Sequence, residues 1–301
     1  MDELYESLRR SIRGVVKLNE PMKKHTTFGI GGPADLWVEP ETQHELFVLI
    51  DTCRKQDIPC FIIGRGSNLL VRDGGIRGVV INLNRACERL SLEDNAIEVG
   101  AGTSLIALVK FAAHHALQGL EFCAGIPASV GGALATNAGA WGSGITEFVE
   151  TVLVYDPVRK EKNQIARDAI DSGYRRSSIV SHGIILEARF LLQPGDTAEI
   201  SARINQYLSQ RSQSQPLHSR SAGSVFKNPP GEYAGAIIER LGFKGYTHGG
   251  AAVSRIHANF IENLNEASAA DVLSIISEIK QRAMEVMKIE LEEELHIVGE
   301  E

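Results

Sequence analysis

The chain has 301 residues, of which 43% are hydrophobic, so it is long enough for one to three domains with a sizeable core. Its formal net charge of −7 argues against a broad nucleic-acid-binding surface, which would usually be basic. The N-terminal residues Met1–Arg13 are charged and lack the apolar segment of a signal peptide, and no apolar run approaches the length of a membrane-spanning helix. We therefore expect no nucleic-acid partner and no membrane insertion.

The four cysteines, Cys53, Cys60, Cys87 and Cys123, form no Cys-x-x-Cys pair and no metal-binding spacing with histidine. His114 and His115 are adjacent, so on a helix they would point in different directions and could not hold one metal ion together. We expect free thiols in a reducing cytoplasm and no metal site.

The first two thirds of the chain mix strands and helices. Residues 36–38, 61–63, 79–81, 97–99, 152–155 and 184–192 have the apolar patterns of strands. Thr42 begins a helical pattern that continues to Cys53, and a second helical pattern begins at Leu105 and stops near Gly119. This arrangement predicts an α+β fold.

The pattern changes at about Glu199. An amphipathic helix follows, with Ile200, Ile204, Tyr207 and Leu208 on one face. The polar segment 212–221 then predicts a loop and a domain boundary. The last long helix spans about 268–288, with a capping box at its start and an apolar face made of Val272, Ile276, Ile279, Ala283 and Val286.

The most informative segment, Gly125–Gly144, consists mostly of glycine and alanine and contains no charged residue. Its small side chains allow another molecule to approach the backbone, and bare backbone N–H groups can bind an anion such as a pyrophosphate. A tightly packed core turn and a flexible linker are the alternatives. A linker would not carry Ile126, Val130 and Leu134 at spacings that can pack inward.

A second glycine loop, Gly64–Leu70, directly follows a short apolar strand, which is a common position for a ligand-binding loop. Two such loops separated by a strand-rich segment suggest one bound dinucleotide. The segment Gly29–Ala34 also fits the dinucleotide fingerprint Gly-x-Gly-x-x-Ala. It lacks a preceding strand and contains Pro33, and a strand-like segment follows it, so we exclude a Rossmann site there.

Seven motifs occur in an order that resembles the UDP-N-acetylenolpyruvoylglucosamine reductase family, from about Asn19 to Gly299. They include Thr26–Gly32, Gly64–Val71, the segment Gly125–Gly144, and Tyr174-Arg175-x-Ser177. The other three are Ala222–Pro229, His257–Ile261 and Leu291–Leu295.

The resemblance implies non-covalent FAD in an α+β fold of the vanillyl-alcohol-oxidase (PCMH) type with two subdomains, followed by a C-terminal α+β substrate-binding domain. We expect these parts at residues 1–90, 91–198 and 199–301. It also implies a set of FAD contacts in the two glycine loops: Gly64, Arg65, Gly66, Ser67, Asn68, Leu69, Gly125, Ile126, Pro127, Ala128, Ser129, Gly131, Gly132, Asn137, Ala138 and Gly139.

The family reaction implied by the resemblance is the NADPH-dependent reduction of an enolpyruvyl UDP-sugar to UDP-N-acetylmuramate, a peptidoglycan precursor. NADPH acts as co-substrate, and FAD carries the hydride. Arg175, Ser224 and Glu294 match the catalytic residues: a carboxylate-binding cation, a proton donor and a carboxyl group near the C-terminus. Without the family, Arg175 could be a surface ion-pair residue, Ser224 a turn hydroxyl, and the run Glu290–Glu294 a solvated face.

Tyr174, Lys227 and Asn228 are candidates for substrate binding. His257 and Asn259 could organise the substrate face, although a buried structural histidine is an equal alternative. If Leu291–Leu295 enters a strand, Glu292 and Glu294 share one face.

The chain departs from the family pattern at Thr136, Trp141 and His296, and at Ala128, where an alanine implies a turn without positive φ. It also lacks the insertion near residues 178–192 that carries a substrate-covering tyrosine in the longer type of this enzyme. A different flavin oxidoreductase and a non-catalytic flavin or sugar-nucleotide binding protein remain alternatives. We expect a monomer or a weak oligomer.

Overall fold

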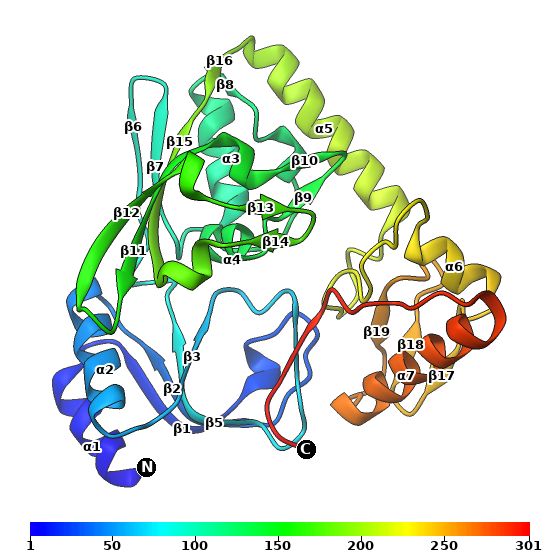
Figure 1. The fold of residues 1–301 in the computed structure, drawn as a ribbon, viewed down its shortest axis with the longest axis horizontal. Helices are drawn as coiled ribbons and strands as arrows, with labels where there is room; N and C mark the ends of the chain where they lie inside the picture. Colours follow the sequence, from blue (N-terminus) through cyan, green and yellow to red (C-terminus); the bar gives the residue numbers. More distant parts are fainter. The chain divides into compact units, whose positions relative to one another are not determined.

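The computed structural model describes all 301 residues, which divide into two compact units (Figure 1). Each unit is assembled from three segments that are distant in the sequence. Unit 1 contains Met1–Leu18, Leu36–Arg65 and Gly78–Gln210, and unit 2 contains Asn19–Asp35, Gly66–Arg77 and Arg211–Glu301. The division into residues 1–90, 91–198 and 199–301 stays a prediction.

The N-terminal third contributes two helices and a four-stranded sheet. Helix α1 spans Asp2–Ser11, and α2 spans Gln43–Lys55. As expected, Thr42 caps α2: its hydroxyl oxygen accepts a hydrogen bond from the backbone N–H of Glu45 at 3.2 Å. The sheet order is β1-β2-β5-β3, in which β3 and β5 are parallel. These strands are β1 (Val15–Pro21), β2 (Pro33–Glu39), β3 (Cys60–Ile63) and β5 (Ile76–Asn82).

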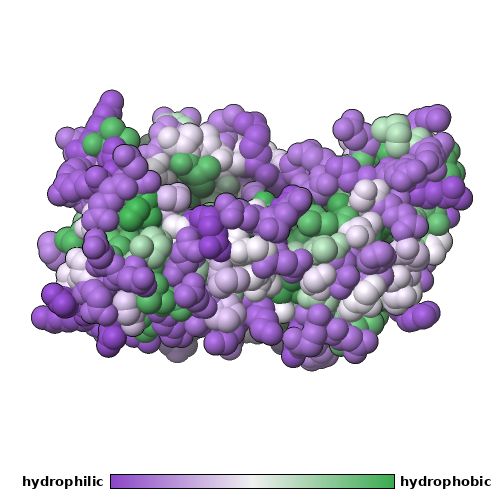
Figure 2. Space-filling model, turned by 90° about the horizontal axis from the view of Figure 1, so that it is seen from below, coloured by the Kyte–Doolittle hydropathy of each residue, from purple (hydrophilic) through white to green (hydrophobic).

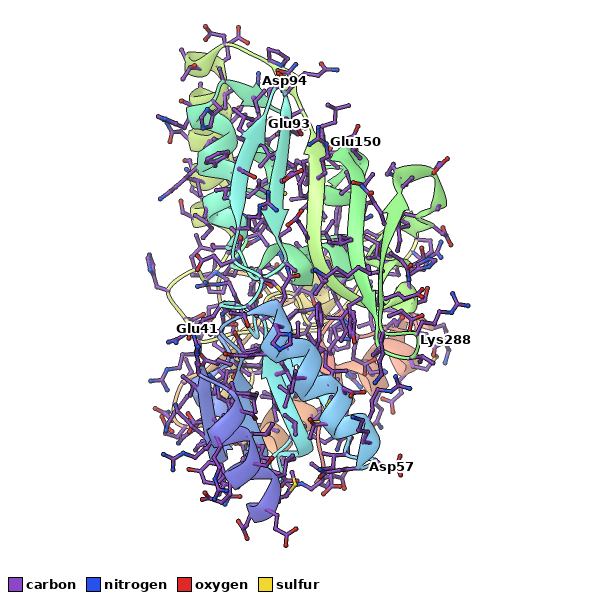
Figure 3. All side chains as sticks on the ribbon, turned by 90° about the vertical axis from the view of Figure 1, so that its left-hand side faces the viewer. Glu41, Asp57, Glu93, Asp94, Glu150 and Lys288 are labelled. Atoms are coloured by element: carbon purple, nitrogen blue, oxygen red, sulfur yellow. The ribbon has the colours of Figure 1, made fainter.

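Unit 1 also contains a five-stranded antiparallel sheet of order β12-β11-β15-β7-β6. Helices α3 (Leu105–His114) and α4 (Val130–Ala135) share its hydrophobic core through Leu105, Leu108 and Val130. Asp94 marks the tip of the β6–β7 hairpin in Figure 3. The strands are β6 (Leu90–Glu93), β7 (Ala96–Gly100), β11 (Val149–Asp156), β12 (Glu161–Ala166) and β15 (Ile184–Leu191).

Unit 2 has its own core, built around α6 (Ala234–Arg240) and α7 (Ala269–Met287). The predicted capping box of α7 is present, because the side chains of Ser268 and Asp271 each accept a hydrogen bond from the other residue's backbone N–H. The predicted apolar face is buried except for Val286, which is 55% exposed. The strands of unit 2 are β4 (Leu69–Val71), β17 (Thr247–His248), β18 (Ala251–Val253), β19 (Ile261–Asn263) and β20 (His296–Val298).

Shorter elements complete the fold. The two-residue strands are β8 (Leu117–Gln118), β9 (Gly139–Ala140), β10 (Ser143–Gly144), β13 (Ser172–Gly173), β14 (Arg176–Ser177) and β16 (Gln193–Pro194). Short 3-10 helices span Met22–Lys24, Glu121–Cys123, Ile145–Phe148, Arg167–Ala169 and Ile179–His182. Figure 2 shows hydrophilic residues over most of the visible face, with small hydrophobic areas between them.

Two expectations about segment boundaries need correction. Helix α5 spans Thr197–Ser214, so the polar segment 212–221 begins as helix and becomes a loop only after Ser214. Serine and glutamine are tolerated on an exposed helix face, which is why polarity alone placed the start of the loop too early. The glycine stretch is likewise more regular than a loop, because it contains α4 and the β9–β10 hairpin.

The fingerprint-like segment Gly29–Ala34 leads directly into β2, which confirms that no helix follows it. Ala128 is absent from the residues with positive φ, as its side chain requires. No helix is both long enough and apolar enough to cross a membrane.

All four cysteines are free thiols, and only Cys60 is exposed. It begins β3, just beyond the turn that Asp57 marks in Figure 3. A hydrogen bond from the Cys53 thiol lowers the pKa of the Cys60 thiol, and burial raises the pKa of Cys87 to about 12. Exposure and a lowered pKa both favour reaction, so Cys60 is the cysteine that we expect to react first.

We expect Cys60 to be the first cysteine alkylated when the folded protein is treated with a limiting amount of iodoacetamide. Peptide mass spectrometry of timed samples measures the order of labelling. A Cys60→Ser variant should lose the fast phase and keep the slow labelling of the buried thiols. Fast labelling of Cys53, Cys87 or Cys123 in the native protein would refute this prediction.

Candidate functional site

The two glycine loops predicted from the sequence meet within unit 1. A Cβ atom placed on Gly64 would lie only 2.1 Å from the Ser129 hydroxyl oxygen, so this position accepts no side chain. The Gly64 carbonyl also accepts a hydrogen bond from the Asn82 side-chain amide at 2.8 Å. The structure therefore brings together the start of one loop and the centre of the other.

The backbone donors of the glycine stretch differ from the expectation. The N–H groups of Val130 and Gly131 donate to the carbonyl oxygens of Thr103 and Ala101 at 2.9 and 2.8 Å. The N–H of Gly132 donates to the Ser129 hydroxyl at 3.3 Å. The first N–H groups of a helix have no acceptor within the helix. For α4, other parts of the protein provide these acceptors. These three groups are therefore not available to bind an anion.

The Gly64–Leu70 loop offers the backbone donors that the glycine stretch lacks. The N–H groups of Arg65, Gly66 and Ser67 make no hydrogen bond within the protein. Gly66 has a φ of +61°, and a Cβ there would lie 2.1 Å from the His25 carbonyl oxygen, so the loop conformation requires glycine. Consecutive free N–H groups in such a loop can bind a pyrophosphate, so the residues present fit the diphosphate of FAD.

Arg175 lies in the turn between β13 and β14, next to the glycine stretch. Its φ is +54°, an uncommon conformation for a residue with a side chain. The guanidinium Nη1 donates to the Gly139 carbonyl at 3.0 Å, and its central carbon lies 5.3 Å from the centre of the exposed Tyr174 ring. The next residue, Arg176, instead pairs with Asp171 at the surface. Of these two guanidinium groups, that of Arg175 hydrogen-bonds to the segment predicted to bind the cofactor, and that of Arg176 hydrogen-bonds to Asp171.

Ser224 and Glu294 belong to adjacent backbone segments in unit 2. Ser224 pairs with Phe260 in an isolated β-bridge, and the backbone N–H of Glu294 donates to the Val225 carbonyl at 2.8 Å. The Asn68 side-chain amide also donates to the Glu294 carbonyl at 3.1 Å. The segments that carry these two residues are distant in the sequence and adjacent in the structure, and Asn68 links the Gly64–Leu70 loop to Glu294.

Asn259 holds the backbone that carries Ser224. Its side chain is only 4% exposed; its Oδ1 accepts from the Phe226 N–H at 3.0 Å, and its Nδ2 donates to the Phe226 carbonyl at 2.8 Å. The His257 Nδ1 accepts from the Asn259 N–H at 3.2 Å, and burial lowers the pKa of this histidine. Both residues therefore shape the backbone of this unit, which favours a structural His257.

Replacement of Asn259 by alanine is expected to destabilise the protein, because the buried N–H and carbonyl of Phe226 would both lose their partners. The expected loss is about 2–6 kcal/mol in the free energy of unfolding, at about 1–3 kcal/mol for each unsatisfied group. Urea unfolding measures it. Asn265→Ala, at an exposed asparagine, is the matched control and should change little. Equal stability of both variants would contradict the role of Asn259.

The glutamate run does not form the strand considered above. Strand β20 begins only at His296, and the neighbouring glutamates have different partners. Glu292 Oε1 lies 2.5 Å from Lys227 Nζ, and Glu293 Oε1 lies 2.7 Å from Lys280 Nζ. Strand alternation therefore does not explain which glutamate faces a site.

The substrate-binding candidates have structural partners as well. Lys227 forms the ion pair with Glu292 described above, with 29% of its own side chain exposed. The Asn228 Oδ1 accepts from the Ala234 N–H at 3.0 Å and so caps the start of α6. Their contacts with substrate, and those of Tyr174, stay predictions.

Family comparisons cover most of the chain. Residues 34–158 match the model of an FAD binding domain. Residues 215–298 match the model of the UDP-N-acetylenolpyruvoylglucosamine reductase C-terminal domain. The expected fold class, an α+β FAD-binding fold followed by a C-terminal domain, is confirmed.

Curated relatives resemble the chain over its whole length. The UDP-N-acetylenolpyruvoylglucosamine reductase of Geobacter metallireducens is 44% identical, covering 100% of this chain and 99% of the relative. That of Syntrophus aciditrophicus is 42% identical, covering 98% of this chain and 96% of the relative. The crystal structure of UDP-N-acetylenolpyruvylglucosamine reductase from Thermus caldophilus superposes with a TM-score of 0.82 at 36% identity, covering 96% of this chain and 100% of that one.

Proposed function

Because the chain belongs to the UDP-N-acetylenolpyruvoylglucosamine reductase family, we propose that it reduces UDP-N-acetyl-enolpyruvoylglucosamine to UDP-N-acetylmuramate with NADPH, as an FAD-dependent oxidoreductase of peptidoglycan precursor synthesis. One observation carries the proposal beyond the similarity: the segments of Ser224 and Glu294 are joined by the hydrogen bond between Glu294 N–H and Val225 carbonyl. This bond supports the proposal because it holds the backbone of Glu294 beside the segment that carries Ser224.

A bound FAD would supply the hydride-transfer chemistry between NADPH and the vinyl carbon of the substrate. The free N–H groups of Arg65, Gly66 and Ser67 would hold its diphosphate. Gly64 keeps the loop close to Ser129, where any side chain would clash. The protein thus provides binding and orientation through backbone groups.

The substrate carboxylate needs a cation, since hydride addition increases negative charge on the carbon that bears it and on the carboxylate itself. We assign this role to Arg175, whose planar guanidinium can bind a carboxylate with two parallel hydrogen bonds. Its Nη1 donates to the Gly139 carbonyl, which attaches the guanidinium to the glycine stretch. Glu294 would complete the polar surroundings of the carboxylate.

Completion of the reaction needs one proton at the carbon next to the carboxylate. We assign the donor role to Ser224, whose hydroxyl is a weak acid in water but can transfer a proton to a carbanionic centre when it is held in place. The Asn259 amide, bonded to both backbone groups of Phe226, supports this assignment because it fixes the segment.

We further propose that the protein acts in the cytoplasm, as a monomer or a weak oligomer. The four free thiols support a reducing compartment. Small molecules are the partners that this family membership implies: NADPH and the UDP-sugar.

A product assay in deuterated water tests the proposed function. Purified protein is incubated with NADPH and the enolpyruvyl UDP-sugar, and the product is examined by mass spectrometry and NMR. We expect UDP-N-acetylmuramate with solvent deuterium at the carbon next to the carboxylate and unlabelled hydride in the new methyl group. Failure to form this product, with FAD bound and NADPH oxidised, would favour a flavin oxidoreductase with a different substrate.

A further inference from the structure

We propose that the buried Thr146 is a positioning residue for Arg175, acting through the side chain of Asn137. This inference rests on the proposed function, since it concerns the residue assigned to the substrate carboxylate. Arg175 lies in a two-residue turn at positive φ, so the hairpin that carries it must be held from outside. The question is which groups hold it.

Asn137 connects the glycine stretch to that hairpin. Its Nδ2 donates to the Gly173 carbonyl at 2.9 Å, at the end of β13 and two residues before Arg175. Its Oδ1 accepts from the backbone N–H of Thr146 at 3.2 Å. A backbone N–H can only donate and a carbonyl can only accept, so the orientation of this side-chain amide is fixed. Asn137 itself has a φ of +46°.

Thr146 supplies the second half of the link. Its side chain is fully buried, and its Oγ1 lies 2.9 Å from Asn137 Oδ1 and 3.0 Å from the Ser172 hydroxyl oxygen. Because Oδ1 can only accept, the single hydroxyl proton of Thr146 points to Asn137, and the Ser172 hydroxyl donates to Thr146. Arg167 Nη2 lies 3.4 Å from that serine oxygen and can donate to it.

The network therefore reaches β13 at two successive residues. Thr146 contacts Ser172 directly, and it contacts Gly173 through Asn137. On the far side of the turn, the Arg175 guanidinium donates to Gly139, two residues after Asn137. The hairpin is thus attached to the glycine stretch at two places. Gly173 on β13 bonds to Asn137, and the Arg175 guanidinium bonds to Gly139. Hydrogen-bond networks anchored on a buried hydroxyl such as that of Thr146 favour one geometry, because a broken bond at the buried end leaves a polar group unpaired.

The test uses Thr146→Val, which keeps the shape of the side chain and removes the hydroxyl. We expect the reaction with the enolpyruvyl UDP-sugar to slow about 10- to 100-fold, as for a small misplacement of a substrate-binding group. Bleaching of bound FAD by NADPH should not change, because it does not use the substrate carboxylate. Thr146→Ser, which restores the hydroxyl, should recover most of the rate.

Two controls separate this proposal from a purely structural role. Thr151→Val removes another hydrogen-bonded threonine hydroxyl, which contacts Gln164 on β11–β12, and should leave both steps unchanged. A second readout is calorimetric binding to Thr146→Val. Affinity for UDP-N-acetylmuramate, which carries the carboxylate, should fall, whereas affinity for UDP-N-acetylglucosamine, which lacks it, should stay the same.

A double-mutant cycle gives the decisive result. In an Arg175→Met background, Thr146→Val should cause no further loss of sugar reduction if it acts only through Arg175. An equal loss in both backgrounds, or a Thr146→Val variant that slows both steps alike, would overturn the inference. If Arg175→Met alone leaves sugar reduction unchanged, the assignment of Arg175 in the proposed function fails instead.

Discussion

A Ser224→Ala variant is expected to reduce the enolpyruvyl UDP-sugar about 10²- to 10⁴-fold more slowly than the native protein, which is the range for loss of a positioned proton donor. Its FAD content and its bleaching by NADPH should be unchanged. The serine lies in unit 2, and the backbone at this position is held by pairing with Phe260, which does not involve the hydroxyl. Removal of the hydroxyl should therefore affect the chemistry and leave the fold intact.

Rapid mixing with each substrate in turn, followed by flavin absorbance, measures the two steps separately. Ser219→Ala is the matched control, since its hydroxyl donates to the Pro216 carbonyl in the preceding loop. That variant should resemble the native protein in both steps. Unchanged sugar reduction by Ser224→Ala would show that the proton comes from another group.

An Arg175→Met variant is expected to lose about 10²- to 10³-fold in sugar reduction, comparable to loss of one preorganised electrostatic contact at developing charge. Methionine keeps much of the length of the side chain and removes the charge and the paired N–H groups. The loss should appear in the step with the UDP-sugar and not in oxidation of NADPH.

Its neighbour provides the control for Arg175. Arg176 is exposed and pairs with Asp171, and ion pairs at a surface contribute little to stability. Arg176→Met should therefore retain sugar reduction and nearly all stability. Similar losses in the two methionine variants would indicate damage to the hairpin as a whole and would argue against a specific role for Arg175.

Local patterns with a direct physical cause were predictable from the sequence. Thr42 and Ser268 cap their helices as expected, because each hydroxyl accepts a hydrogen bond from the backbone N–H three residues later, and Asp271 completes a capping box with Ser268. The requirement for glycine at position 64 also has a direct physical cause, because the close approach of Ser129 leaves no room for a side chain. The glycine content of the two loops suggested that both bind one dinucleotide, and the structure places Gly64 beside Ser129.

Partnerships between distant residues were not predictable in this way. Nothing in the local sequence around Thr146 indicates a bond to Asn137, because the two are joined only when the glycine stretch folds back beside the β13–β14 hairpin. The satisfied N–H groups of α4 were missed for a related reason. A glycine-rich sequence suggests a loop with unpaired N–H groups. Only the fold shows that two of these groups donate to the carbonyl oxygens of Ala101 and Thr103.

The most direct test of the account is a sequential reaction without oxygen. Purified protein with bound FAD is first bleached with one equivalent of NADPH, and the enolpyruvyl UDP-sugar is then added. We predict that the flavin colour returns in full and that one equivalent of UDP-N-acetylmuramate is formed. A protein that binds no FAD, or one that stays bleached after the sugar is added, would contradict the account.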